Sequence, residues 1–107
     1  MRQDRSDAER QRAFVGALYE GEGSAWSQRR RGRKPSPRLE LSMNDAEPVE
    51  RFARYVGFGS VHRTRSGMTR WSADGRANAN MFALWVGGLL SPRRQRQLDR
   101  AVHGDDQ

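Results

Sequence analysis

The chain has 107 residues, and 20 Lys and Arg against 13 Asp and Glu give it a formal net charge of +7. It contains no cysteine, which excludes disulfide scaffolds, cysteine-zinc sites and thiol catalysis. The length suits one small domain, expected over residues 1–107 with a folded core at 6–103 and flexible ends at 1–5 and 104–107. The longest apolar run, 81–90, is too short to span a membrane and no signal-peptide core is visible, so we expect a soluble, cytoplasmic protein.

The first half of the chain predicts a helix, two strands and a second helix. Ser6-Asp-Ala-Glu9 is a capping box, which predicts a helix that starts near Asp7 and stops at residues 21–23. Strands are expected over 24–29 and 37–43, because apolar and polar residues alternate in the second of them. Asn44 or Asp45 would cap the next helix, whose core-facing stripe is Val49, Phe52, Ala53 and Val56.

The second half predicts a hairpin and two more helices. The strands 60–65 and 68–74 flank a Ser-Gly turn at 66–67, and Ser91-Pro92 is typical of a helix start. In the helix between them we expect Ala77, Met81, Leu84 and Trp85 to face the core.

This order predicts an α+β fold, α-ββ-α-ββ-α-α, in which a four-stranded antiparallel sheet carries its helices on one face. The other face would be polar and basic and free to bind a ligand. Strand phase places on it Trp26, Gln28, Arg30, Arg38, Glu40, His62, Thr64 and Arg70.

Basic residues cluster between the first two expected strands. Six of the ten residues 29–38 are basic, and all six are arginine except Lys34, the only lysine of the chain. Arginine forks suit phosphate oxygens and guanine edges, so Arg33, Lys34 and their neighbours predict a loop that contacts a polyanion. A solvated loop in an arginine-rich composition is the plainer interpretation.

Small residues form a stripe along the first helix. Ala13, Ala17 and Gly21 are spaced i, i+4 and i+8, which allows another helix to approach closely. The stripe could pack against the chain's own sheet, or it could meet its copy in a two-fold homodimer. In a dimer, Gly16 and Glu20 would join the interface, although Glu20 also suits a structural role as a cap or ion-pair partner.

Two acids lie at the end of this helix, where the helix dipole is already negative. Glu20 and Glu22 would attract a cation there. If the helix pairs with its symmetry mate, two Glu22 carboxylates converge, and hard oxygen ligands of this kind suit Mg²⁺.

The segment 15–23, VGALYEGEG, resembles the LAGLIDADG motif of homing endonucleases. The resemblance extends over residues 10–102, through the LELSMND stretch at 39–45, the VGFGSV turn at 56–61 and the helix after Ser91-Pro92. It implies a single-motif homodimer whose sheets form a saddle in the DNA major groove. It also implies that Glu22 and the Gly21 carbonyl bind the metal, with Arg93 or Arg94 assisting. A polar residue often ends the second strand in this family, where this chain has Met43.

The leading hypothesis is a Mg²⁺-dependent, homodimeric endonuclease that hydrolyses double-stranded DNA at a pseudo-palindromic site and associates with the nucleoid when bound. It would have no membrane partner and no small-molecule substrate. The alternatives are a DNA-binding regulator of the same fold without catalysis, and an RNA-binding splicing helper of the maturase type.

Overall fold

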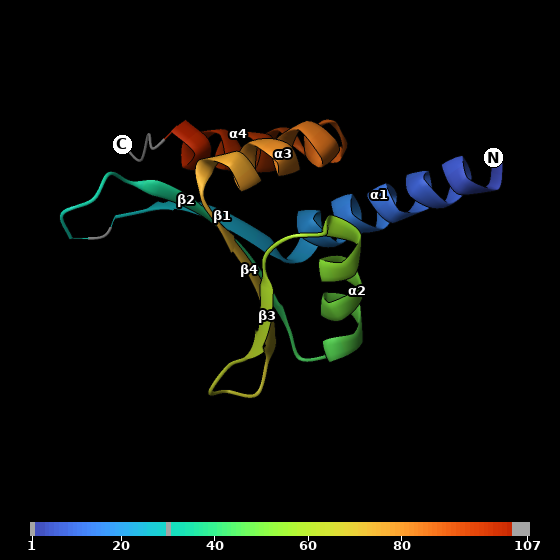
Figure 1. Cartoon of the computed structure of the whole chain (residues 1–107), viewed down its shortest axis with the longest axis horizontal. Helices are drawn as coiled ribbons and strands as arrows, with labels where there is room; N and C mark the ends of the chain where they lie inside the picture. Colours follow the sequence, from blue (N-terminus) through green and yellow to red (C-terminus); the bar gives the residue numbers. More distant parts are fainter. Residues whose placement is uncertain (1, 30, 104–107) are drawn as a thin grey trace.

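The computed structural model describes residues 2–29 and 31–103, and its elements follow the predicted order (Figure 1). The α+β fold with helices on one face of an antiparallel sheet is therefore confirmed. The helices are α1 (Arg2–Glu22), α2 (Ala46–Val56), α3 (Arg76–Val86) and α4 (Pro92–His103), with a 3-10 turn at Gly87–Leu89. The strands are β1 (Gly23–Gln28), β2 (Ser36–Met43), β3 (Ser60–Arg63) and β4 (Thr69–Asp74).

The four strands form one antiparallel sheet in the order β1-β2-β4-β3. Alternation along β2 decides its orientation: Leu39 and Leu41 are buried, and they lie opposite Ala73 and Trp71 of β4. The intervening residues point to the side that no helix covers, here called the open face (Figure 1). Because the side-chain period of a strand is two, this register fixes every residue of the open face.

Aromatic rings fill the core between the sheet and the helices. The Trp71 ring contacts Phe52 of α2 at a centroid distance of 4.9 Å, and Phe82 of α3 lies 4.8 Å from Tyr19 of α1. Edge-on ring pairs of this kind add to the free energy of apolar burial. The core therefore ties α1, α2 and α3 to the centre of the sheet.

The ends of α2 are set by their capping residues. The Asp45 side chain accepts a hydrogen bond from the backbone N–H of Glu47, as an N-cap does. Gly57 adopts φ 86° and donates its N–H to the Ala53 carbonyl, which ends the helix. Val49 and Phe52 are buried as predicted, so the stripe assigned to this helix is confirmed.

Two expectations about the helices are wrong. The first helix begins at Arg2 and not near Asp7, so residues 2–5 belong to it. The N-terminal part of this helix projects from the body of the domain (Figure 1). In α3 the buried residues are Ala79, Phe82 and Val86. Of the residues expected to face the core, Trp85 packs against it, whereas Ala77, Met81 and Leu84 are exposed. The cause is that α3 has apolar residues on two sides, and Phe82 fits the aromatic core.

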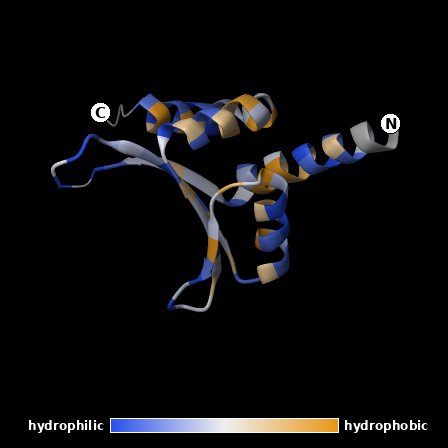
Figure 2. Ribbon diagram, in the orientation of Figure 1, coloured by the Kyte–Doolittle hydropathy of each residue, from blue (hydrophilic) through white to orange (hydrophobic). Residues whose placement is uncertain are grey.

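The expected tail at 104–107 lies outside the described residues. Within 2–29 and 31–103, no helix has both the length and the apolar character that crossing a membrane requires. The coloured part of the loop after β1 is mostly hydrophilic, whereas apolar residues concentrate where the helices meet the sheet (Figure 2).

Candidate nucleic-acid and metal site

The small residues of α1 lie in two different environments. Ala13, Ala17 and Gly21 are exposed, and among the described residues nothing other than its chain neighbours and the backbone of α1 lies within 4 Å of the position that a Cβ would take at Gly21. Gly16 is buried instead, and Leu89 packs so closely against it that a Cβ at this position would lie 2.9 Å from Cδ1 of Leu89. The placement of Gly16 in a dimer interface is therefore corrected: it permits close packing of α1 within its own chain.

Glu20 is engaged inside the chain. Its Oε1 accepts a hydrogen bond of 2.8 Å from the backbone N–H of Ser91, the residue just before α4. This hydrogen bond is the main cause that holds the pKa of Glu20 below its usual value, with the positive charges of Arg94 and Arg93 adding to it. Glu20, predicted to lie in a dimer interface, thus joins α1 to α4.

The two candidate arginines differ sharply in their surroundings. Arg94 is 9% exposed, and its Nε donates to the backbone carbonyl of Glu20 across 3.0 Å. Arg93, the neighbouring residue of α4, is exposed. Only Arg93 of this pair presents an accessible guanidinium.

Glu22 is the last residue of α1 and is exposed. A carboxylate and the free carbonyls of a helix end are hard oxygen donors, so Glu22 and the Gly21 carbonyl fit a divalent cation such as Mg²⁺. Among the described residues, no group of three or more His, Asp or Glu could hold a metal ion. Of the two carboxylates at this end of α1, that of Glu20 is bonded to Ser91 and that of Glu22 is exposed.

The open face is organised around Arg38 and Arg70 in the middle strands. Arg38 donates to Glu40 across 3.1 Å and to Asp74 across 2.9 Å. Burial works to lower the pKa of Arg38, but the hydrogen bonds and charges of Asp74 and Glu40 outweigh it and raise that pKa. Arg70 donates to Ser42 across 2.9 Å and lies 3.6 Å from Glu40.

Other predicted residues lie at the edges of this face. Trp26 is 40% exposed on β1 opposite Arg38, and His62 is exposed on β3 opposite Arg70. The assignment of Thr64 to the face of a strand is wrong, since β3 ends at Arg63. Thr64 instead belongs to the turn, where its Oγ1 accepts from the N–H of Met68.

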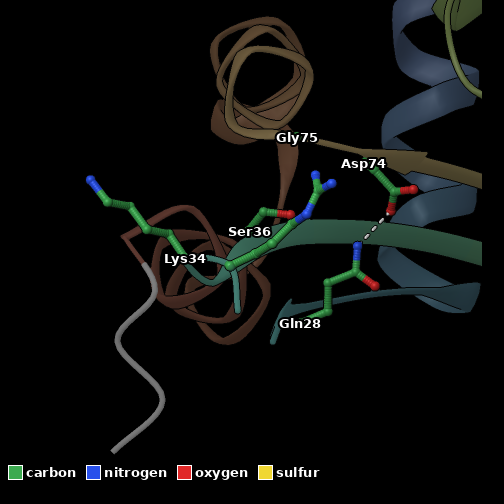
Figure 3. Close-up of a pocket in the computed structure, with 6 residues that line it drawn as sticks. Gln28, Lys34, Ser36, Asp74 and Gly75 are labelled. Carbon is green, nitrogen blue, oxygen red and sulfur yellow. Dashed lines mark hydrogen bonds between the residues drawn. The ribbon is translucent and has the colours of Figure 1, made fainter. Parts of the chain in front are cut away.

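A shallow hollow lies where the basic loop meets the end of the sheet (Figure 3). Gln28 reaches across it and donates to Asp74 over 3.0 Å, while Lys34 points away into solvent. Arg33 and Lys34 are both exposed, and Arg30 lies outside the described residues. The hollow is lined by Gln28, Arg33, Lys34, Ser36, Asp74 and Gly75.

Three hydrogen-bond partners of the predicted site residues were not predicted from the sequence. Asp74 and Ser42 orient the two arginines of the open face, and Ser91 bonds to Glu20. The alternation in β2 and β4 already places Ser42 and Asp74 on the open face. Their pairing with particular arginines depends on the strand register, which the amino-acid sequence alone does not reveal.

The fold is shared with a group of solved structures. No protein-family model and no curated protein matches the chain. Among solved structures, the homing endonuclease I-CvuI, crystallised with a DNA target and 2 mM Mg, superposes with a TM-score of 0.77 at 12% identity, over 91% of this chain and 66% of that one. The homing endonuclease I-TnaI gives 0.72 at 14% identity, over 86% and 69%.

The LAGLIDADG meganuclease I-AabMI, bound to uncleaved DNA, gives a TM-score of 0.71 at 12% identity over 82% of this chain. The chain spans slightly less than two thirds of I-CvuI and 33% of I-AabMI. The chain has the fold of the LAGLIDADG homing endonucleases, and the resemblance predicted from residues 15–23 is confirmed at that level.

Proposed function

We propose that this chain is a homodimeric, Mg²⁺-dependent endonuclease that cuts double-stranded DNA at a pseudo-palindromic site. One observation carries the proposal: the exposed stripe of Ala13, Ala17 and Gly21 ends directly at the exposed carboxylate of Glu22. A second copy packed along that stripe brings two Glu22 carboxylates together.

A paired carboxylate site supplies what phosphodiester hydrolysis requires. A divalent metal, when bound, makes a water nucleophilic and neutralises charge on the leaving oxygen. Glu22 and the Gly21 carbonyl would hold it, and the exposed Arg93 would face the charge that develops on the phosphate. Each Glu22 then serves one strand, which explains why a two-fold protein suits a pseudo-palindromic site.

The open face suits duplex DNA. Antiparallel strands enter the major groove and read base edges, and Arg38 and Arg70 are the donors at the centre of this face. The exposed loop residues Arg33 and Lys34 would contact phosphates beside the groove. I-CvuI and I-AabMI, which share the fold, were crystallised with DNA.

A second candidate, a DNA-binding protein without catalysis, is favoured by Met43. This residue ends β2 where relatives of the motif often carry a polar group, and its side chain packs against the core. It therefore offers no polar contact to a metal-bound water. Both candidates predict the same dimer and the same open face.

The deciding experiment exposes a randomised duplex library to the purified chain with Mg²⁺ or with EDTA. The nuclease predicts cuts at one pseudo-palindromic sequence that disappear in EDTA. Enrichment of a bound duplex without cutting supports the second candidate, and preference for structured RNA contradicts both.

The dimer is tested separately by Ala17→Gln, which places a long side chain in the stripe. Light scattering should show a monomer for this variant and a dimer for the unmodified chain. Ala77→Gln, an equivalent change at an exposed position of α3, is the control and should remain dimeric. A dimeric Ala17→Gln variant would contradict this interface.

A further inference from the structure

The last turn of α1 is bonded to the first turn of α4. Oε1 of Glu20 accepts from the backbone N–H of Ser91 across 2.8 Å, and the backbone carbonyl of Glu20 accepts from Nε of Arg94 across 3.0 Å. Glu20 therefore contacts the start of α4 twice, through its side chain to Ser91 just before the helix and through its main chain to Arg94 in the first turn.

Arg94 has little freedom to move. Its guanidinium also donates from Nη1 to Oε1 of Gln97 across 2.8 Å, and its backbone N–H donates to Oγ of Ser91 across 3.2 Å. The residue is 9% exposed. The guanidinium is planar and buried and is bonded to both acceptors, so its position is coupled to that of the Glu20 carbonyl.

The final carbonyls of a helix have no partner within the helix, so contacts from elsewhere decide where they point. In α1 those carbonyls include Glu20, which Arg94 binds, and Gly21, which precedes the exposed Glu22. Among the described residues, nothing other than its chain neighbours and the backbone of α1 lies within 4 Å of the Cβ position at Gly21, whereas Tyr19 before it is buried and Gly23 after it pairs with Leu41 of β2. The core and the sheet therefore hold this end of α1 on either side, and the contact with α4 binds the Glu20 carbonyl between them.

We propose that Arg94 and Glu20 are positioning residues that aim the Gly21 carbonyl and the Glu22 carboxylate at the metal, and that Arg93 alone acts on the DNA. This inference rests on the proposed function. It assigns different roles to two adjacent arginines that share chemistry and differ in burial and partners. Arg94 acts only through the geometry of α1.

The test measures metal affinity without cleavage. Binding of Mn²⁺, a hard divalent cation with the ligand preferences of Mg²⁺, is followed by electron paramagnetic resonance on the complex with the selected duplex. Arg94→Lys keeps the charge but loses the planar fork that reaches both acceptors. We expect it to weaken Mn²⁺ binding about 10-fold, as loss of a group that orients a ligand does. DNA affinity in EDTA should not change.

Arg76→Lys is the matched control. Arg76 also donates from Nε to a backbone carbonyl across 3.0 Å, but its acceptor is Val102, at the other end of α4. The Mn²⁺ affinity of the Arg76→Lys variant should equal that of the unmodified chain. Arg93→Gln should likewise keep Mn²⁺ affinity while slowing cleavage in Mg²⁺.

A second pair covers the case in which Arg94→Lys does not fold. Glu20→Gln retains an oxygen that accepts from Ser91 and should bind Mn²⁺ normally, whereas Glu20→Ala should show the loss. The inference is overturned if the unmodified chain binds Mn²⁺ and neither Arg94→Lys nor Glu20→Ala weakens it, or if Arg76→Lys weakens it equally. A complex that binds no Mn²⁺ in the unmodified form contradicts the proposed nuclease itself.

Discussion

Nε of Arg70 on β4 donates to Oγ of Ser42 on β2 across 2.9 Å, which fixes the direction of an arginine in the middle of the open face. A guanidinium already aimed at the groove loses less conformational freedom when it contacts a base than a free one does. The order of the strands, not their composition, creates this pair.

We therefore predict that Arg70→Gln relaxes sequence preference at one base pair of each half-site. The expected loss of discrimination there is about 1–3 kcal/mol, typical of one arginine-to-base contact. Ser42→Ala should give a smaller change at the same base pair. Selection from a randomised library measures this, and uniform weakening at all positions would show that Arg70 contacts only phosphate.

The basic loop should act through phosphates. Replacing Arg33 and Lys34 by glutamine should weaken binding to every duplex alike, because both are exposed loop residues away from the central strands. Each lost phosphate contact should reduce the slope of log affinity against log salt by about 0.9. Titrations at several salt concentrations measure the slope, and an unchanged slope would place the loop away from DNA.

Gly59 is predicted to be critical for stability. It adopts φ 89°, and a Cβ there would lie 2.5 Å from Nε1 of Trp71 and 2.7 Å from the Ser72 carbonyl. Gly59→Ala should therefore destabilise the fold by about 2 kcal/mol or more, from backbone strain and overpacking together. Gly67→Ala, at φ 91° with no atom within 4 Å, adds strain alone and should cost less in thermal unfolding. Equal losses would refute the contact with Trp71.

Tyr19 is predicted to make stability depend on alkaline pH. Burial raises the pKa of its hydroxyl well above the ordinary 10.0, and that hydroxyl has no hydrogen-bond partner among the described residues. The unfolded chain loses this proton near pH 10 while the folded chain keeps it, so stability is intact below pH 10 and falls above it by about 1.4 kcal/mol per pH unit.

Tyr19→Phe should remove this contribution to the alkaline loss. At neutral pH it should stabilise the fold by about 1 kcal/mol, because a buried hydroxyl without a partner is unfavourable. Denaturant unfolding at pH 7 and between pH 10 and 11 measures both effects. A parallel decline of both proteins above pH 10 would contradict the assignment to Tyr19.

The order of elements could be predicted from the sequence because local signals repeat it. Gly57 ends α2, and the alternation around Leu39 and Leu41 sets the phase of β2. The core face of α3 could not be predicted in this way, because a short helix with apolar residues on two sides is oriented by its neighbours. Here Tyr19 of α1 contacts Phe82 of α3.

Part of the geometry of the candidate site could be predicted from the sequence, while its metal-binding role stays a prediction. Glu22 and the exposed stripe of α1 followed from helical spacing and from the motif at 15–23. The difference between Arg93 and Arg94 did not, because it depends on the distance from Arg94 to a carbonyl in a helix more than 70 positions away in the chain. Partners that meet only through the tertiary fold leave no local pattern.

The most direct test of the proposed metal site is cleavage of the selected duplex by Glu22→Gln in Mg²⁺. This change removes the charge of one exposed side chain and keeps its size, so folding and duplex binding in EDTA should be unaltered. We predict that cleavage disappears, whereas Glu9→Gln, at another exposed acid of α1, cuts normally. Undiminished cleavage by Glu22→Gln would contradict the role of this carboxylate and with it the proposed metal site.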